Sequence, residues 1–209
     1  MEKALINSIN SVFTKEVTDT LYNAVHLGYI LTEKAFKELP ILKNIGANDI
    51  RPHIRRIAVD HALRKSKERL PTVTSAEYKK NKANNCNHLE LIIDRFIITA
   101  NYVENLTDLP RGAIFRDDLI SLNYDLFEKK EISDKVYLVL THGGDGVSPL
   151  FASLKIPGTG STHYSISSHQ FDPINSTLIK IAKVENTDID IDIEFNEFRE
   201  GLSDESVKG

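Results

Sequence analysis

Hydrophobic residues recur at helical spacing through the first 70 residues of the chain. Such spacing gathers apolar side chains on one face of a helix. The apolar positions of the first two predicted helices include Leu5, Ile9, Val12, Phe13, Leu21 and Val25. Residues 48–70 predict a third helix, because Asn48 or Asp49 can cap its start, Pro52 suits its first turn and Pro71 stops it.

After Pro71 the hydrophobic pattern changes to that of strands. Residues 89–103 are largely apolar and β-branched, and they predict one long strand or a hairpin that turns near Asp94–Arg95. Residues 116–130 predict a short helix, and residues 158–176 an exposed irregular segment. Further strands are predicted at 135–141, 149–158, 176–184 and 187–195.

Helices come first along the chain and mostly neighbouring strands follow. This order predicts an α+β fold with a helical N-terminal part packed on a mainly antiparallel β-sheet. The expected divisions are a helical part at 1–70, a mainly antiparallel β part with one short helix at 71–200, and a polar tail at 201–209. The first two parts are compatible with a single domain.

The stretch TDIDIDIEF, residues 187–195, alternates acidic and apolar side chains. At strand spacing, Asp188, Asp190, Asp192 and Glu194 would share one face. An EF-hand loop is excluded, because Ile193 stands where the turn needs glycine and Arg199 where a bidentate glutamate belongs. We therefore expect the solvated face of a half-buried strand. The alternative is a docking surface for a basic partner or for the protein's own basic helix.

The composition indicates a soluble globular protein of 209 residues, of which 41% are hydrophobic and 27% charged. The single cysteine, Cys86, excludes an intrachain disulfide and favours a reducing compartment. No segment has the apolar length of a signal peptide core or a membrane span. We expect a cytoplasmic protein that does not enter a membrane.

Charge is distributed unevenly along the chain, whose net charge is −4. Residues 51–82 hold ten Lys or Arg against three acids, whereas residues 183–209 hold nine acids against three bases. The basic residues predicted to contact an anionic partner are Arg51, Arg55, Arg56, Lys65, Lys67, Arg69, Lys79 and Lys80. Nucleic acid or an acidic protein would suit them. The alternative is a solvated helix whose charges are paired within the chain, for instance Asp60 with Arg56.

A second candidate site consists of histidines and aspartates that follow residue 140: His142, Asp145, His163, His169 and Asp172. These side chains could bind a transition metal or act as acid and base. Their spacing matches no metal motif, so scattered loop residues are the alternative, and no cofactor is predicted. The sequence THGGDG lies between two predicted strands, which favours a hairpin turn over a phosphate-binding loop.

Arg111 and Arg116 flank the turn at Pro110–Gly112. Their guanidinium groups could hold a phosphate or carboxylate, or could lock the turn to the sheet. Taken together, the residues favour a binding or regulatory protein over an enzyme. The alternatives are a metal-dependent hydrolase or nuclease that uses the His and Asp residues, and a homo-oligomeric module in which the acidic segment of one copy pairs with the basic helix of another.

Overall fold

The computed structural model describes residues 3–84, 86–128, 135–144, 147–158, 161–171 and 190–205. The N-terminal part is helical as the sequence predicts. Its elements are α1 (Lys3–Val12), α2 (Lys15–Glu38), the 3-10 turns η1 (Pro40–Lys43) and η2 (Ile45–Ile50), and α3 (Arg51–Arg69). The second helix begins at Lys15, because the Thr14 side chain caps it by accepting from the Val17 amide.

Helices α2 and α3 pack closely against each other at Gly28. A Cβ atom at Gly28 would lie 2.6 Å from the Cα atom of Val59, so only glycine permits this helix crossing. The glycine that weakens the helix by propensity therefore allows the close approach of its partner.

The remaining chain builds a six-stranded sheet in the order β1-β2-β3-β4-β5-β6. Its elements are β1 (Val73–Lys80), β2 (Asn87–Ile93), β3 (Phe96–Tyr102), α4 (Ile114–Glu128), β4 (Val136–Gly144), β5 (Pro149–Pro157) and β6 (Thr162–Gln170). All neighbouring strands are antiparallel except β3 and β4, which are parallel. The predicted fold class, α+β with N-terminal helices on a mainly antiparallel sheet, is confirmed.

The hairpins at Asp94–Arg95 and between β4 and β5 are confirmed. Asp94 has a φ of 54°, the left-handed conformation that a tight hairpin turn uses. The irregular segment predicted at 158–176 is wrong over 162–170, where β6 pairs with β5. Strand β1 was also not predicted. Strands β1 and β6 are the edge strands of the sheet and carry many polar side chains, so their sequences show little hydrophobic alternation.

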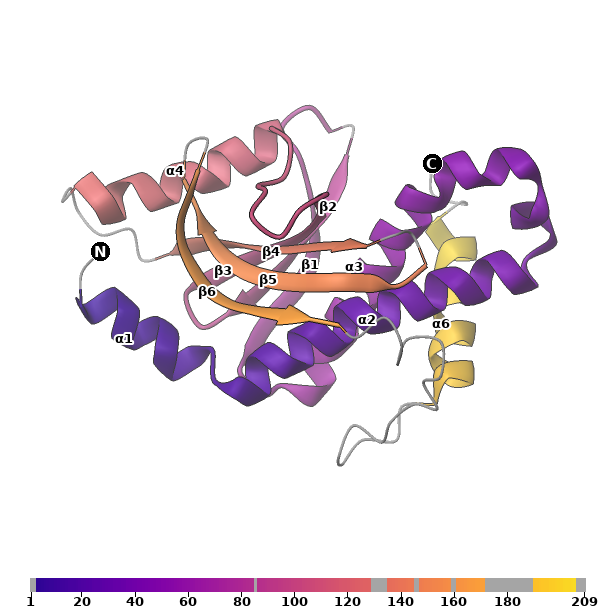
Figure 1. Ribbon diagram of the computed structural model, residues 1–209, viewed down its shortest axis with the longest axis horizontal. Helices are drawn as coiled ribbons and strands as arrows, with labels where there is room; N and C mark the ends of the chain where they lie inside the picture. Colours follow the sequence, from indigo (N-terminus) through magenta and orange to yellow (C-terminus); the bar gives the residue numbers. More distant parts are fainter. Residues whose placement is uncertain are drawn as a thin grey trace.

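The two faces of the sheet are covered by different helices (Figure 1). Along β4, Val136, Leu138 and Leu140 join the large core under the N-terminal helices, whereas Tyr137 and Val139 face α4. Buried Asn123 fixes α4 to the sheet. Its amide nitrogen donates to the Tyr137 and Pro157 carbonyls, both at 3.0 Å, and its oxygen accepts from the Tyr137 amide at 2.9 Å.

The strand predicted over 187–195 is wrong from Ile191 onward, because helix α6 spans Ile191–Glu205. Residues 176–184 and 187–189 lie outside the described residues. Phe195 and Phe198 are each 2% exposed, whereas Ile193 is 57% exposed, so the buried side follows the period of a helix. Asp190 caps the helix, and its Oδ1 atom accepts from the amides of Asp192 and Ile193.

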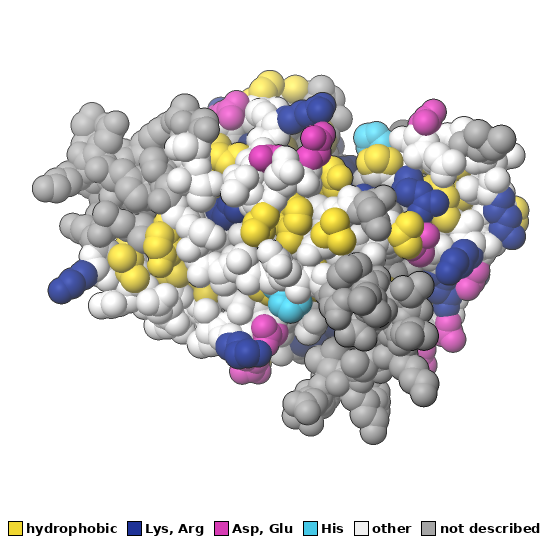
Figure 2. Space-filling view, in the orientation of Figure 1, with side chains coloured by type: hydrophobic (Ala, Val, Ile, Leu, Met, Phe, Trp, Pro, Cys, Tyr) yellow, Lys and Arg dark blue, Asp and Glu magenta, His cyan; other side chains and the backbone are white. Residues whose placement is uncertain are grey.

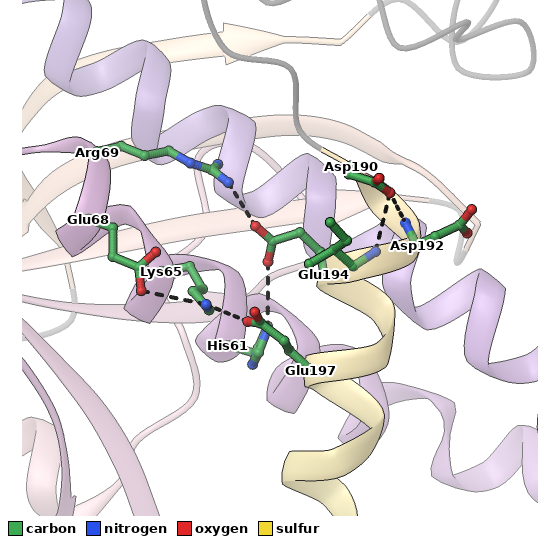
Figure 3. Close-up of polar contacts among 9 residues, drawn as sticks. His61, Lys65, Glu68, Arg69, Asp190, Asp192, Glu194 and Glu197 are labelled. Carbon is green, nitrogen blue, oxygen red and sulfur yellow. Dashed lines mark hydrogen bonds and ion pairs between the residues drawn. The ribbon is translucent and has the colours of Figure 1, made fainter.

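Helix α6 lies beside α2 and α3 (Figure 1). The pairs Arg69–Glu194 and Lys65–Glu197 link it to α3 (Figure 3), and the pair Lys34–Asp192 links it to α2. The acidic segment therefore pairs with the basic helix of its own chain. Among the described residues, no helix has the length and apolar character needed to cross a membrane.

Candidate anion-binding cleft

The carboxyl ends of the parallel pair β3 and β4 lie side by side, with Tyr102 opposite His142 in the register. The chain leaves β3 at this end, runs through residues 103–113 and enters α4. Ligands of open sheets commonly bind beyond the carboxyl ends of parallel strands, because the connecting segments separate there. This end of the sheet is therefore the place where a ligand site is expected.

Three adjoining cavities open at this end of β3. The first has a volume of about 660 Å³ and is lined by Pro52, His53, Arg55, Arg56, Val59, Asp60, Ala100, Asn101, Tyr102, Arg111 and His142. The second, of about 380 Å³, shares His53, Arg56, Asp60, Ala100 and Asn101 with the first and adds Cys86, His88, Leu89, Thr99, Phe115 and Arg116. The third contains Arg111, Arg116, Glu104 and Asp108. We call the first two cavities together the cationic cleft.

Four arginines line or border the cationic cleft from two directions. Arg55 and Arg56 come from the first turns of α3, and Arg111 and Arg116 from the segment that leads into α4. Asp60 is the acid among the lining residues of the cleft. The balance of charge on these walls is therefore positive, and the nearby start of α3 adds the positive end of its helix dipole.

Arg116 is the most firmly held of these arginines. It is 7% exposed, and its guanidinium donates to the Arg111 carbonyl and to Oδ1 of Asn101. Its Nε atom is buried and has no hydrogen-bond partner among the described residues. Of the two roles considered for the arginines at this turn, Arg116 has the locking one, because it ties the turn to β3.

Arg55 is equally buried but is held by aromatic rings. Its guanidinium carbon lies 4.7 Å from the ring centroid of Tyr29 and 5.8 Å from that of Tyr102. Arg56 is exposed and donates to the Asn87 carbonyl at 2.9 Å. The ring of Tyr102, 48% exposed, forms part of the cleft wall.

His142 lies at the inner wall of the cleft and is fully buried. Burial lowers its pKa to about 3, with a smaller contribution from the positive charge of Arg55. The ring is therefore neutral at pH 7, and its Nδ1 atom is 3.1 Å from the hydroxyl of Tyr29. A ring held neutral in this way positions its neighbours and does not add charge to the cleft.

His88 forms part of the second cavity. Its ring stacks on Phe115 with centroids 3.9 Å apart, and its Nε2 atom lies 3.1 Å from Oε1 of Glu90. The Nδ1 atom of His88 is buried without a hydrogen-bond partner among the described residues. Arg116 and His88 both line the second cavity, and each has a buried nitrogen without a hydrogen-bond partner among the described residues.

The basic residues predicted from the sequence fall into three groups. Arg55 and Arg56 line the cleft. Arg51, Lys65 and Arg69 form ion pairs with Glu33, Glu197 and Glu194 respectively. Lys67, Lys79 and Lys80 are exposed near the end of α3 and along β1, where Lys79 lies 3.0 Å from Glu77. The face in Figure 2 shows Lys and Arg scattered among Asp and Glu.

The predicted His and Asp set is only partly described. Asp145, Asp172 and the side chain of His163 lie outside the described residues. His142 and His169 occupy the same face of the sheet with Ala152 between them, which places them roughly 10 Å apart at ordinary strand spacing. His169 stacks on Tyr22 and His142 contacts Tyr29, so the two rings have separate surroundings.

The sequence did not single out His53, His88, Asn101 or Tyr102 as site residues. Asn101 and Tyr102 could have been found from their position at the carboxyl end of a predicted strand. That position indicates a site only when the parallel pairing of β3 with β4 is known.

No family model matches the chain, and neither the curated proteins nor the solved structures compared with it contain a match.

Proposed function

We propose that this chain is a binding protein that holds an anionic group, a phosphate or a carboxylate, of a small molecule in the cationic cleft. The observation that carries the proposal is the convergence of Arg55, Arg56, Arg111 and Arg116 on one hollow with Asp60 as the acid in its lining. Guanidinium groups suit such ligands because their donors match the oxygens of both groups.

The size and wall chemistry of the cleft favour a small molecule. A volume of about 660 Å³ falls within the range common for such sites. Val59, Ala100 and the Tyr102 ring supply an apolar wall for the body of the ligand. Exposed Arg111 lines the first cavity and buried Arg116 lines the second, and each contributes the positive charge of a guanidinium group. Because two of the arginines are fixed by their neighbours, little ordering is required on binding.

The sequence pattern indicates nucleic acid or an acidic protein as the anionic partner, whereas this proposal favours a small anionic molecule. An extended nucleic acid would need a continuous row of available cations. Three of the predicted basic residues, Arg51, Lys65 and Arg69, are already engaged in ion pairs. A compact ligand needs only the guanidinium groups that line the cleft.

The test measures the binding of inorganic pyrophosphate and citrate by calorimetry at low salt, one probe for each anionic group. Arg111→Gln is the informative variant, because the Arg111 side chain is exposed. The hydrogen bond from Arg116 goes to the backbone carbonyl of Arg111, so the substitution leaves that bond in place. Arg64→Gln is the matched control, since Arg64 is an exposed residue of α3 that lines a different cavity. Both variants remove one positive charge.

We expect at least one probe to bind the wild type and Arg64→Gln equally. Arg111→Gln should bind it roughly tenfold or more weakly, since a charge-assisted hydrogen bond contributes about 1.5–3 kcal/mol. If neither probe binds, or if the two variants lose affinity equally, the cleft is not the site. Single-stranded DNA serves as a third probe: binding that depends on Lys79 and Lys80 but not on Arg111 would contradict the proposal.

A further inference from the structure

The contact between α3 and α6 contains a second group of side chains that is separate from the cleft. His61 comes from α3, and Glu194 and Glu197 project from one face of α6 three residues apart (Figure 3). One ring nitrogen of His61 and one carboxylate oxygen from each glutamate all lie within 4.8 Å of one another. The triad therefore brings three potential metal ligands, one nitrogen and two oxygens, close together from two helices.

Two of these atoms lack the partners that buried polar atoms normally have. Nε2 of His61 and Oε2 of Glu194 are both buried without a hydrogen-bond partner among the described residues. They face each other at 3.9 Å, which is too long for a hydrogen bond. Buried polar atoms are rarely left in this state, and a bound ion is one of the recognised explanations.

We propose that His61, Glu194 and Glu197 bind a divalent transition metal of the zinc type, with water as a further ligand. Bond lengths of about 2.0–2.1 Å in a tetrahedral site place ligand atoms roughly 3.3 Å apart. Rotation of the two glutamate side chains would bring the three atoms from their present separations, which are within 4.8 Å, to this value. An imidazole among the ligands favours zinc and its neighbours over magnesium and calcium.

The surroundings allow the ion to enter. His61 and Glu197, together with Lys65 and Glu68, line a cavity of about 630 Å³, so water and an ion can approach these two ligands of the triad from outside. Burial lowers the pKa of His61, and its ring is therefore neutral and able to offer a lone pair at pH 7.

Ion pairs within the chain compete with the metal for both carboxylates. Lys65 contacts Glu197, and Nη2 of Arg69 donates to Oε1 of Glu194 at 2.8 Å. Glu194 keeps Oε2 for the metal while Oε1 stays bonded to Arg69. Lys65 has a second acid, Glu68, at 3.5 Å and can turn to it when the metal takes Glu197. The ion would thus join α6 to α3 without leaving a charge unpaired.

The experiment titrates chelator-treated protein with Zn²⁺ in competition with a zinc-sensitive dye, and with Co²⁺ monitored by visible absorption. The informative variants are His61→Ala and Glu197→Gln. The second protects the test against misfolding, because the Glu197 side chain is 43% exposed. His169→Ala is the control, since His169 is an exposed histidine that lies beside Tyr22 and Phe171, away from the triad.

We expect one Zn²⁺ per chain, a Co²⁺ spectrum with the intense visible bands of a tetrahedral site, and a rise in melting temperature on Zn²⁺ addition. His61→Ala and Glu197→Gln should each weaken Zn²⁺ binding at least tenfold, the loss that even outer-shell partners of a metal site cause. The control should bind as the wild type does.

The proposal is overturned if the wild type binds no Zn²⁺ or if both triad variants bind it unchanged. It is also overturned if the affinity is lost in His169→Ala instead. None of these outcomes depends on whether the cationic cleft binds an anion, because Arg111 and Arg116 do not contribute to the triad.

Discussion

Nη2 of Arg69 donates to Oε1 of Glu194 at 2.8 Å, which joins the last turn of α3 to the first turn of α6. The Glu194 side chain is 12% exposed and that of Arg69 27% exposed, so the pair is partly shielded from water. One residue of the basic helix and one of the acidic segment thus meet within a single chain. Part of the charge asymmetry of the sequence therefore serves to hold α6 against α3 through ion pairs.

Apolar burial should contribute more to this docking than the ion pairs do. Phe198 is 2% exposed, and we expect Phe198→Ala to lower the free energy of unfolding by about 3–5 kcal/mol. Arg69→Gln should cost up to about 1 kcal/mol, as partly solvated ion pairs do. Urea denaturation followed by circular dichroism measures both changes.

Ile193→Ala is the matched control for Phe198→Ala, because Ile193 lies on the same helix but is 57% exposed. Its free energy of unfolding should stay within about 0.5 kcal/mol of the wild type. A loss at Ile193 equal to that at Phe198 would mean that α6 presents a different face to the core.

The misassigned segment shows where sequence patterns are ambiguous. Over 187–195 the acids and isoleucines alternate, which fits a strand, but Ile191, Phe195 and Phe198 also fit one side of a helix. The helical period becomes visible only when the window extends past residue 195. Asp190 as the cap was the other available signal.

The central strands were predictable because their environment is uniform. Residues of β4 are buried on both faces, so the segment is continuously apolar. The edge strands β1 and β6 each present polar residues to solvent, and their patterns resemble loops. Strand order and the parallel β3–β4 pairing are long-range properties that no local pattern encodes.

The cleft was only partly predictable for the same reason. Arg111 and Arg116 attract notice locally because they flank a proline–glycine turn. Their proximity to Arg55 depends on how α3 crosses the sheet and on where residues 103–113 lie. Basic residues near each other in sequence, such as Arg51 and Arg55, have different surroundings in the structure.

Burial of His142 should make the stability of the protein depend on pH. Its pKa is about 3 in the folded protein, against 6.5 ordinarily, so between these values the unfolded chain binds a proton that the folded chain does not. Stability should therefore fall as the pH drops through this window, by at most about 1.4 kcal/mol per pH unit from this residue. Burial also lowers the pKa values of His26 and His61, which act in the same direction.

Urea denaturation at several pH values between 4 and 7 measures this dependence. His142→Gln keeps a polar side chain beside Tyr29 but removes the titrating group, so its stability should fall less steeply with acid than that of the wild type. Tyr29→Phe is the control, because it removes the hydrogen bond at His142 and leaves the burial, and its slope should match the wild type. If the stability of His142→Gln and of the wild type depended equally on pH, burial would not lower the pKa of His142.

Lys155 should determine the order of the segment that borders the cleft. It lies on β5, is 3% exposed, and its ammonium group donates to the carbonyls of Leu106 and Asp108, at 2.5 and 2.9 Å. Lys155→Met fills a similar volume without these bonds, and we expect it to cost about 1–3 kcal/mol of stability. Amide hydrogen exchange of residues 104–112 should accelerate, and the pyrophosphate or citrate affinity of the cleft should fall with it.

Lys135→Met is the control, because Lys135 is an exposed lysine before β4. This substitution should leave both measurements unchanged. Exchange that stays slow in Lys155→Met would show that the turn around Arg111 and Arg116 holds the segment without help from the sheet.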